Sequence, residues 1–271
     1  MTTLTADNVG TLALGGELEV RRLGFGAMRL TGPGIWGEPA DREECKRVLT
    51  RALELGINLI DTADAYGPEV SENLIAETLY PYPDDLVIAT KGGLLRSGPN
   101  QWPPDGSPEH LREACEGSLR RLKLDRIDVY QFHRPDPKVP FEESVGALRE
   151  LQDEGKIRLV GLSNVSTDQL AAAQAIVDIV SVQNRYNLAD RSSEDVLEQC
   201  EQQGIAFIPW APIDAGNATV ANEVAIAWLL HRSPVMLPIP GTSKVEHLEQ
   251  NVRAAEIDAE TMAEALSRID L

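Results

Sequence analysis

Four residues with side chains suited to acid–base chemistry lie at or just after short apolar runs: Asp61, Tyr66, Lys91 and His133. A lysine among apolar residues is costly unless it is paired, and Asp61 is the available partner. The pair would place an ammonium group beside Tyr66, where it stabilises the phenolate and lowers the pKa of the phenol from about 10. Such a phenol suits the protonation of a developing alkoxide. The pattern therefore predicts a general acid.

Taken singly, each of the four residues has an ordinary structural explanation. An aspartate after a strand often caps a helix or forms a turn, and a tyrosine in a loop usually packs against its neighbours. A lysine at a strand end is usually a solvated charge, and a histidine there is often a hydrogen-bonded structural ring. The four groups follow consecutive apolar runs, however, and this combination favours an active site.

Eight short apolar runs alternate with eight amphipathic segments, and these elements must position the four residues. The apolar runs are 23–28, 58–63, 86–91, 127–133, 159–164, 179–184, 205–211 and 235–240. The amphipathic segments are 41–56, 71–80, 107–123, 141–156, 166–177, 192–204, 219–233 and 243–256. Continuous apolar runs are typical of parallel strands covered on both faces. We predict an α/β fold, a (β/α)8 TIM barrel that occupies residues 1–271 as a single domain.

Local signals refine the predicted barrel. Residues 11–20 indicate a β-hairpin around Gly15 and Gly16 that could close the N-terminal mouth, and residues 258–270 indicate an extra C-terminal helix. Helix starts are signalled at Ser107, Ser166 and Ser192–Ser193, and helix ends at Gly56, Gly155 and Gly204. A doubly wound open sheet is the alternative fold. It would prefer fewer strands and a G-x-G-x-x-G turn, whereas the first strand here reads GFGAMR.

Active sites of such barrels lie at the C-terminal ends of the strands, where the four residues are expected. The segments NLIDTADAYG, ATKGG, DVYQFHR, GLSN, VQNRYN and PIPGTSKVEHLEQN resemble the aldo-keto reductase superfamily in order and approximate spacing, over essentially the whole chain. The resemblance implies a catalytic tetrad in which Tyr66 is the acid, Lys91 tunes it, Asp61 holds Lys91 and His133 orients the substrate carbonyl. The implied reaction is hydride transfer from a nicotinamide to an aldehyde or ketone, which yields an alcohol.

The same resemblance implies NADPH as the cofactor, with NADH as the alternative, and identifies residues that would bind it. Ser163, Asn164 and Gln183 match residues that hold the nicotinamide carboxamide, and Trp210 matches an aromatic residue that stacks on the nicotinamide ring. Gly26 and Ala27 lie where the first barrel loop approaches the cofactor. The segment that holds the adenosine end is matched by Gly241, Thr242, Ser243, Lys244, His247, Gln250 and Asn251.

The adenosine segment also has the physics of an anion site, because it combines helix N-terminal amides, two hydroxyl groups and Lys244. Two features depart from the family's pattern. His247 stands where many members have an arginine that grips the 2′-phosphate. An imidazole is a weaker partner for an anion, so the strength of the preference for NADPH over NADH stays open. The segment after Trp210 is short, so either cofactor exchange is easier or Asp214–Thr219 does the work of a longer loop.

Met28, Trp36 and Trp102 are predicted to line the substrate pocket, because the first and third barrel loops carry them. Apolar, aromatic pockets accept many small carbonyl compounds, so the physiological substrate stays open. The loop 97–110 and the chain end are the expected specificity elements. The oligomeric state also stays open.

The composition excludes several classes of partner. The 271 residues include 25 basic and 43 acidic residues, a net charge of −18, which disfavours nucleic acid and anionic membrane surfaces. No apolar stretch reaches the ~18 residues of a membrane span. The start MTTLTADNVG has no basic or apolar part of a secretion signal, so we expect a cytoplasmic protein. Cys45, Cys115 and Cys200 have neither metal nor disulfide spacing and are expected in the core.

Two other functional classes compete with a reductase. A metal-dependent barrel hydrolase would need several histidines or carboxylates that converge on a metal, whereas only His133 follows a predicted strand and no H-x-H motif occurs. We therefore predict no metal site. The second class is a nucleotide-binding sensor or partner subunit with little turnover, as in potassium-channel beta subunits. The complete tetrad favours turnover over this alternative.

Overall fold

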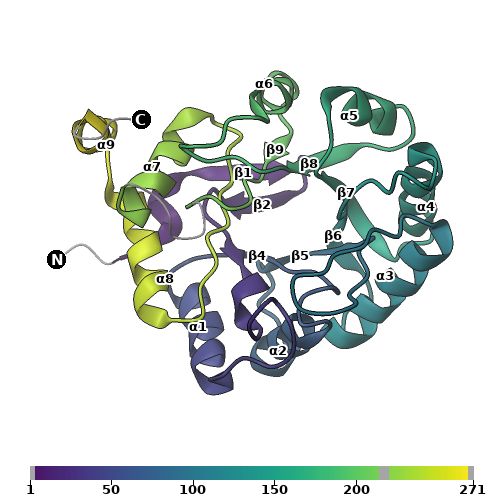
Figure 1. Ribbon diagram of the computed structural model, residues 1–271. Coiled ribbons are helices and arrows are strands. Elements are labelled where there is room, and N and C mark those ends of the chain that lie inside the picture. Colours follow the sequence, from purple (N-terminus) through teal and green to yellow (C-terminus); the bar gives the residue numbers. More distant parts are fainter. Residues whose placement is uncertain (1–3, 214–219, 268–271) are drawn as a thin grey trace.

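Seven parallel strands form one curled sheet whose order follows the chain (Figure 1). The computed structural model describes residues 4–213 and 220–267. The strands are β3 (Phe25–Gly26), β4 (Leu59–Asp61), β5 (Val87–Gly92), β6 (Ile127–Phe132), β7 (Ile157–Ser163), β8 (Ile179–Gln183) and β9 (Ala206–Phe207). Each lies within or overlaps a predicted apolar run, so seven of the eight predicted strands are confirmed.

The eighth predicted run, residues 235–240, closes the barrel without forming a regular strand. On one side, the Phe207 amide donates to the Val235 carbonyl at 2.9 Å, and the Leu237 amide donates to the Phe207 carbonyl at 2.9 Å. On the other side, the Gly24 amide donates to the Pro238 carbonyl at 3.0 Å. Proline has no N–H group to donate, so Pro238 and Pro240 interrupt a regular ladder. The prediction of a strand here is wrong, although the segment occupies the eighth position.

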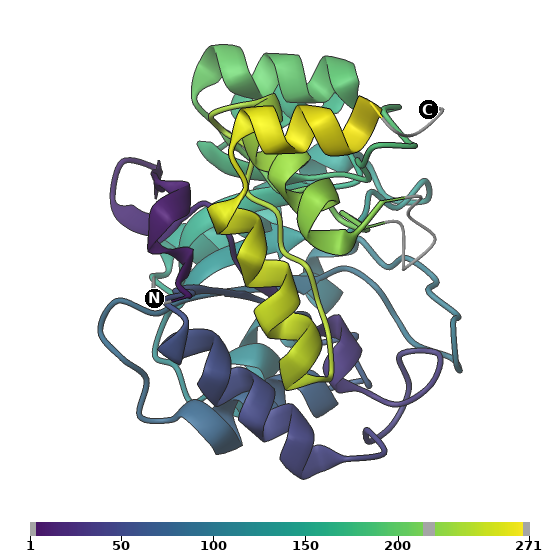
Figure 2. The same ribbon diagram turned by 90° about the vertical axis from the view of Figure 1, so that its left-hand side faces the viewer.

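Helices follow the strands and cover the outside of the sheet (Figures 1 and 2). They are α1 (Arg42–Glu54), α2 (Val70–Leu79), α3 (Pro108–Leu122), α4 (Phe141–Asp153), α5 (Thr167–Gln174), α6 (Glu194–Gln203), α7 (Asn222–Arg232) and α8 (Val245–Val252). The side chains of Ser107 and Ser166 cap α3 and α5 as predicted. Ser193 precedes α6, but its side chain makes no capping hydrogen bond. Gly56, Gly155 and Gly204 all have positive φ at helix ends.

The N-terminal hairpin closes one end of the barrel. Its strands β1 (Thr11–Leu14) and β2 (Leu18–Arg21) pair in antiparallel fashion, and Leu14 and Val20 pack into the interior cluster with Leu59, Val87 and Leu159. The predicted position of the hairpin is therefore confirmed. The predicted extra C-terminal helix is α9 (Ala259–Ser267), which contacts α7. The described residues also form short 3₁₀ helices: η1 (Ala6–Val9), η2 (Ala27–Leu30) and η4 (Arg253–Glu256).

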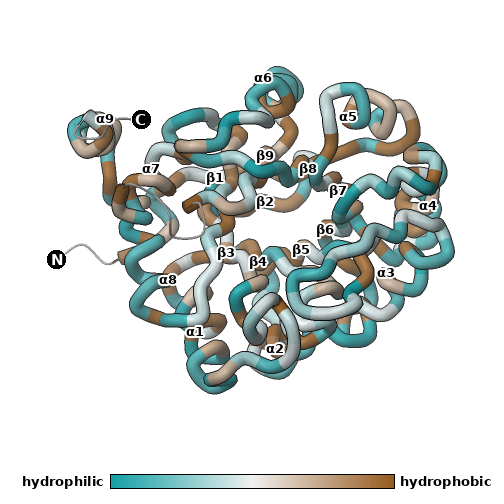
Figure 3. The backbone as a smooth tube through the Cα atoms, in the orientation of Figure 1, coloured by the Kyte–Doolittle hydropathy of each residue, from teal (hydrophilic) through white to brown (hydrophobic). Residues whose placement is uncertain are grey.

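Apolar side chains fill the barrel and the layer between sheet and helices, while polar residues predominate on the outer helix surfaces (Figure 3). The three cysteines, Cys45, Cys115 and Cys200, are buried and free, as predicted. Within residues 4–213 and 220–267, no helix has the length and apolar character needed to cross a bilayer. Buried polar side chains concentrate toward the C-terminal ends of the strands, where the candidate site lies.

Candidate active site

Lys91 is the centre of the tetrad and is completely buried. Val87, Ala89 and Lys91 alternate along β5 toward the barrel interior, so the strand's pleat carries the lysine inward. Its Nζ donates to Asp61 Oδ1 at 2.5 Å, to the Thr62 carbonyl at 2.8 Å and to Tyr66 Oη at 3.3 Å. Burial lowers the pKa of Lys91, but Asp61 and Tyr66 outweigh it and raise the pKa overall. The lysine is therefore held as a cation beside the phenol.

Asp61 is held from its other side by two buried glutamines. Gln131 Nε2 and Gln183 Nε2 both donate to Asp61 Oδ2, at 2.8 Å and 2.9 Å, and Gln183 Nε2 also reaches Gln131 Oε1 at 3.2 Å. Sequence reasoning missed Gln131. It pairs in register with Lys91 and Gly161, and a Cβ atom at Gly161 would approach Gln131 Cγ to 2.9 Å. A polar residue two positions before His133 was the available signal.

Tyr66 lies in the loop after β4 with only 6% of its surface exposed. Burial raises the pKa of Tyr66; Lys91 lowers it and Asp61 raises it, and the net direction is upward. The predicted net lowering of this pKa is therefore wrong, because burial outweighs the ammonium group. Consequently the phenol keeps its proton at neutral pH, as a proton donor must.

His133 follows β6 directly and faces the same space as Tyr66. Their rings pack edge to face with centroids 5.8 Å apart. Burial and the positive charges of Lys91, Arg134 and Arg96 lower the pKa of His133 well below its usual range. Its Nδ1 is buried and has no hydrogen-bond partner within the described residues. The imidazole is therefore neutral at physiological pH and retains one N–H group as a donor.

Asn164 connects His133 with Trp210 just beyond the end of β7. Asn164 has a left-handed backbone, with φ of 59°, and its Nδ2 donates to the His133 carbonyl at 3.0 Å. Trp210 Nε1 donates to Asn164 Oδ1 at 3.0 Å, and Ser163 Oγ donates to the Gln183 carbonyl at 2.8 Å. The predicted carboxamide ligands thus lie together, but their polar atoms already hold one another in place.

Arg96 organises the predicted substrate wall, and sequence reasoning missed it. Its guanidinium lies 3.6 Å from the centroid of Trp102 and 5.5 Å from that of Trp36. It donates to the carbonyl oxygens of Gly34, Ile35, Ala65, Gly98 and Gln101. Met28 and Trp102 pack against Ile35, Ala63 and Tyr66. Met28 and Trp102 therefore adjoin the tetrad's tyrosine, and Trp36 is linked to them through Arg96.

The predicted adenosine segment runs from Gly241 into α8 and lies beside the first barrel loop. Gly26 and Gly241 approach each other so closely that a Cβ atom at Gly241 would lie 2.4 Å from the Gly26 carbonyl oxygen. Ala27 follows as the first residue of η2. Lys244 is the N-cap of α8, which contains His247, Gln250 and Asn251. Thr242 is buried, and its Oγ1 accepts from the Lys244 amide at 3.1 Å.

Two donors in this segment already have acidic partners. The Val245 amide, at the first turn of α8, donates to Glu44 Oε1 at 3.1 Å. Gln250 Nε2 donates to Glu223 Oε2 at 3.0 Å. In the anion site that we predicted from helix N-terminal amides, the Val245 amide is therefore already occupied, because α1 supplies an acid for it. Residues 214–219, which include the predicted replacement loop, lie outside the described residues.

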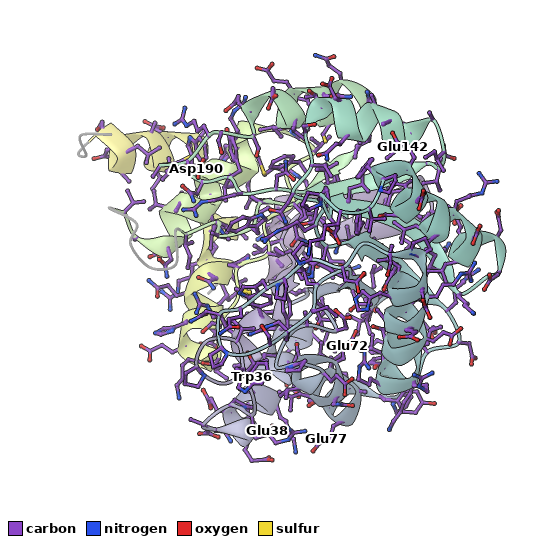
Figure 4. The ribbon with its side chains drawn as sticks, turned by 45° about the vertical axis from the view of Figure 1, so that its right-hand side comes forward. Trp36, Glu38, Glu72, Glu77, Glu142 and Asp190 are labelled. Atoms are coloured by element: carbon purple, nitrogen blue, oxygen red, sulfur yellow. The ribbon has the colours of Figure 1, made fainter. Side chains whose placement is uncertain are left out.

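Asp64 is a further titratable group near the site, and sequence reasoning gave it no role. Its Oδ1 is buried without a partner among the described residues, and burial followed by repulsion from Glu72 raises its pKa to about 8. Glu72 accepts from Thr90 Oγ1 and Arg121 Nε, each at 2.6 Å. Glu72 is buried, whereas Glu38 and Glu77 lie together at the outer surface, where both accept hydrogen bonds from Arg42 (Figure 4).

Asp64→Asn is expected to stabilise the fold, and the gain in stability should increase with pH. Between its ordinary pKa of 3.8 and about 8, Asp64 is protonated in the folded chain and ionised in the unfolded chain. Stability therefore falls as the pH rises through this window, and asparagine removes that loss. We expect little change at pH 5 and a gain of about 1–2 kcal/mol at pH 8, a figure reduced because part of the side chain is exposed.

Urea denaturation at pH 5 and pH 8 measures this effect. The matched control is Asp84→Asn, which removes an exposed carboxylate and should leave the stability unchanged at both pH values. An equal change for Asp64→Asn at both pH values would show that Asp64 titrates normally in the folded protein.

Known proteins resemble this chain in sequence and in fold. The profile of the aldo/keto reductase family matches residues 22–223 and 217–270. An uncharacterized oxidoreductase of Schizosaccharomyces pombe is 51% identical over 98% of this chain and 90% of its own length. The pyridoxine 4-dehydrogenase of Escherichia coli is 42% identical over 94% of this chain and 96% of its own length.

Solved structures agree with these matches. A glycerol dehydrogenase from Gluconobacter oxydans superimposes with a TM-score of 0.81 and 25% identity, covering 97% of this chain and 98% of its own. An aldo-keto reductase from Klebsiella pneumoniae in complex with NADPH has a TM-score of 0.78 and 28% identity, over 94% of this chain and 93% of its own. Sequence and fold lead to the same assignment: the chain belongs to the aldo/keto reductase family of oxidoreductases.

Proposed function

We propose that this oxidoreductase uses NADPH to reduce the carbonyl group of small aldehydes or ketones, with Tyr66 as the general acid. The observation that carries the proposal is the buried chain from Asp61 through Lys91 to Tyr66, in which the lysine ammonium lies 3.3 Å from the phenol oxygen. A nearby ammonium group stabilises the phenolate that forms transiently when the phenol donates its proton. We further propose that residues 1–271 form a single barrel domain.

The adenosine segment packs closely against β3 and holds an unsatisfied polar atom that could bind a nucleotide. Gly26 and Gly241 permit this packing, because a Cβ atom at either position would collide with a backbone carbonyl oxygen of the opposite segment. Asn251 is only 2% exposed, yet its Oδ1 has no partner within the described part of the chain. NADPH bound to the Klebsiella pneumoniae relative supports the same cofactor for this chain. NADPH would be held by Gly26, Ala27, Ser163, Asn164, Gln183, Trp210, Gly241, Thr242, Ser243, Lys244, His247, Gln250 and Asn251.

The tetrad would polarise and protonate the substrate oxygen. When bound, the reduced nicotinamide supplies the hydride. Neutral His133 would donate its remaining N–H to the carbonyl oxygen, and Tyr66 would transfer its phenolic proton to the same oxygen as charge develops there. Lys91 would stabilise the resulting phenolate, while Asp61, Gln131 and Gln183 keep the lysine in position.

Met28, Trp36 and Trp102 would form an apolar wall around the substrate. Arg96 contacts both indoles and Trp102 packs against Tyr66, so the pocket would favour flat or apolar carbonyl compounds. Oxidation of NADPH with a panel of aldehydes, ketones and quinones tests the proposal directly. Turnover with at least one carbonyl class is expected. Tight NADPH binding without turnover on any member would instead indicate a sensor or partner subunit.

Lys244→Ala is expected to lower the affinity for NADPH by roughly 10- to 150-fold and to change the affinity for NADH little. The reason is a lost charge-assisted contact of about 1.5–3 kcal/mol to the 2′-phosphate. The net charge of −18 opposes the more anionic cofactor, but salt at ~0.15 M screens that field beyond ~8 Å. The local contact should therefore prevail. Quenching of tryptophan fluorescence during titration with each cofactor measures both affinities.

The control for this variant is Lys138→Ala, which removes an exposed lysine elsewhere and should alter neither affinity. Equal losses for NADPH and NADH in Lys244→Ala would remove Lys244 from 2′-phosphate recognition. A wild-type protein that prefers NADH would contradict the choice of cofactor itself.

A further inference from the structure

Glu44 brings a carboxylate close to Lys244, the residue that we propose contacts the 2′-phosphate. Glu44 belongs to α1 and lies 201 positions before Val245 in sequence, yet its Oε1 accepts from the Val245 amide at 3.1 Å. Val245 directly follows Lys244, the residue proposed to contact the 2′-phosphate. The two helices pack side by side, as their contacts and Figures 1 and 2 indicate. An acidic group of the protein thus occupies an amide that a phosphate would otherwise bind.

Arg47 completes the group from one turn further along α1. Its Nη2 donates to Glu44 Oε2 at 2.6 Å, and its Nε donates to the same oxygen at 3.0 Å. The Glu44 side chain is only 16% exposed, whereas that of Arg47 is 61% exposed. The carboxylate is therefore enclosed by a backbone amide and a guanidinium, with Lys244 adjacent. These are the same kinds of donor that hold a phosphate.

Resting on the proposed function, we propose that Glu44 sets the choice between NADPH and NADH. Glu44 competes with the 2′-phosphate for the Val245 amide and the Arg47 guanidinium, and it lowers the affinity for NADPH selectively. When NADPH binds, Glu44 gives up these donors, and Arg47 joins Lys244 as a partner of the phosphate. NADH has no 2′-phosphate, so it leaves Glu44 in place. Asn251, whose buried Oδ1 is unpartnered in the described chain, supports a ligand at this same helix.

Electrostatics favour competition over simple coexistence. The Val245 amide, followed by Arg47, lowers the pKa of Glu44, so the side chain is a carboxylate at neutral pH. A phosphate that approached the same amide would meet this negative charge at short range, where salt screens little. A neutral side chain of equal size would remove the repulsion. It would still offer an oxygen to the Val245 amide when the site is empty.

Glu44→Gln is therefore expected to strengthen the binding of NADPH about tenfold, with little change in the binding of NADH. Arg47→Gln is expected to lower the affinity for NADPH several-fold and to leave the affinity for NADH unchanged. The control is Glu43→Gln, one residue away on α1, which removes the same charge from an exposed side chain paired with Lys46. It should alter neither affinity. Titration of the full-length chain with NADPH and NADH, followed by tryptophan fluorescence, gives the ratio of affinities for each variant.

A ratio that rises in Glu44→Gln but not in Glu43→Gln supports the inference. An unchanged ratio, or a loss of NADPH affinity in Glu44→Gln, overturns it and makes Glu44 a helix cap only. The thermal midpoint of each variant separates a folding defect from an effect on binding. If wild type reduces carbonyls with NADPH but the ratio does not move, this inference fails and the proposed function stands. If wild type binds neither cofactor, both fail.

Discussion

Tyr66→Phe is expected to lower kcat by at least ~100-fold, the usual scale for loss of a general acid. The substitution removes one hydroxyl and keeps the ring that packs against Trp102 and His133. Cofactor affinity should therefore survive. Because burial raises the pKa of Tyr66, the wild-type phenol is protonated throughout the neutral range and becomes ineffective as an acid only under alkaline conditions. Steady-state turnover and cofactor titration of the same preparation measure the two effects separately.

The matched control is Tyr82→Phe, which removes a hydroxyl that donates to the Leu122 carbonyl at 2.7 Å on the outside of the barrel. This variant should keep wild-type turnover. Retention of more than about a tenth of the activity in Tyr66→Phe would assign the proton transfer to another group.

Lys91→Met should lower both turnover and stability, and a second substitution should restore only the stability. Without the ammonium group the phenolate of Tyr66 loses its main stabilising charge, so turnover is expected to fall at pH 7. Asp61 would remain buried without its cation, at a cost of about 3–5 kcal/mol. The donors Gln131 and Gln183 still hold Asp61 Oδ2, so we expect the lower end of this range.

The double variant Lys91→Met with Asp61→Asn isolates the ion pair. Asparagine removes the uncompensated charge and keeps the size of the side chain, so the double variant should be more stable than Lys91→Met alone. Its turnover should stay low, because no cation lies beside Tyr66. Thermal midpoints and rates of the two variants and wild type provide the comparison. A double variant no more stable than the single one would mean that Asp61 and Lys91 do not depend on each other.

The position of the tetrad could be predicted because two regular patterns act together. Strand alternation carries Lys91 inward, and parallel strands in a barrel bring their C-terminal ends to one rim, so Asp61 and Lys91 had to meet. The same alternation could have identified Gln131, which precedes His133 by two positions. The net direction of the Tyr66 pKa could not be predicted, because it depends on how completely the loop after β4 buries the ring.

Contacts between distant segments left no signal in the sequence. The pairing of Glu44 with Val245 depends on how α1 packs beside α8. The contacts of Arg96 depend on loop conformations that have no period. The irregular segment 235–240 was mispredicted for a different reason. Its apolar residues predicted a strand, but its two prolines lack the N–H groups that a regular ladder needs. Composition and periodicity thus predict the helices and strands better than they predict contacts between residues that are distant in sequence.

The five carbonyl contacts of Arg96 have a consequence for how the proposed substrate wall can change. One guanidinium is anchored to segments near residues 34–35, 65 and 98–101, which come from different parts of the chain. These segments therefore form a single mechanical unit, and a rearrangement in one of them strains the others. A laboratory or natural variant that exchanges one loop alone would lose the shared anchor. New specificities should accordingly arise by replacing the segments together, or by point changes at Trp36 and Trp102 that leave the anchor intact.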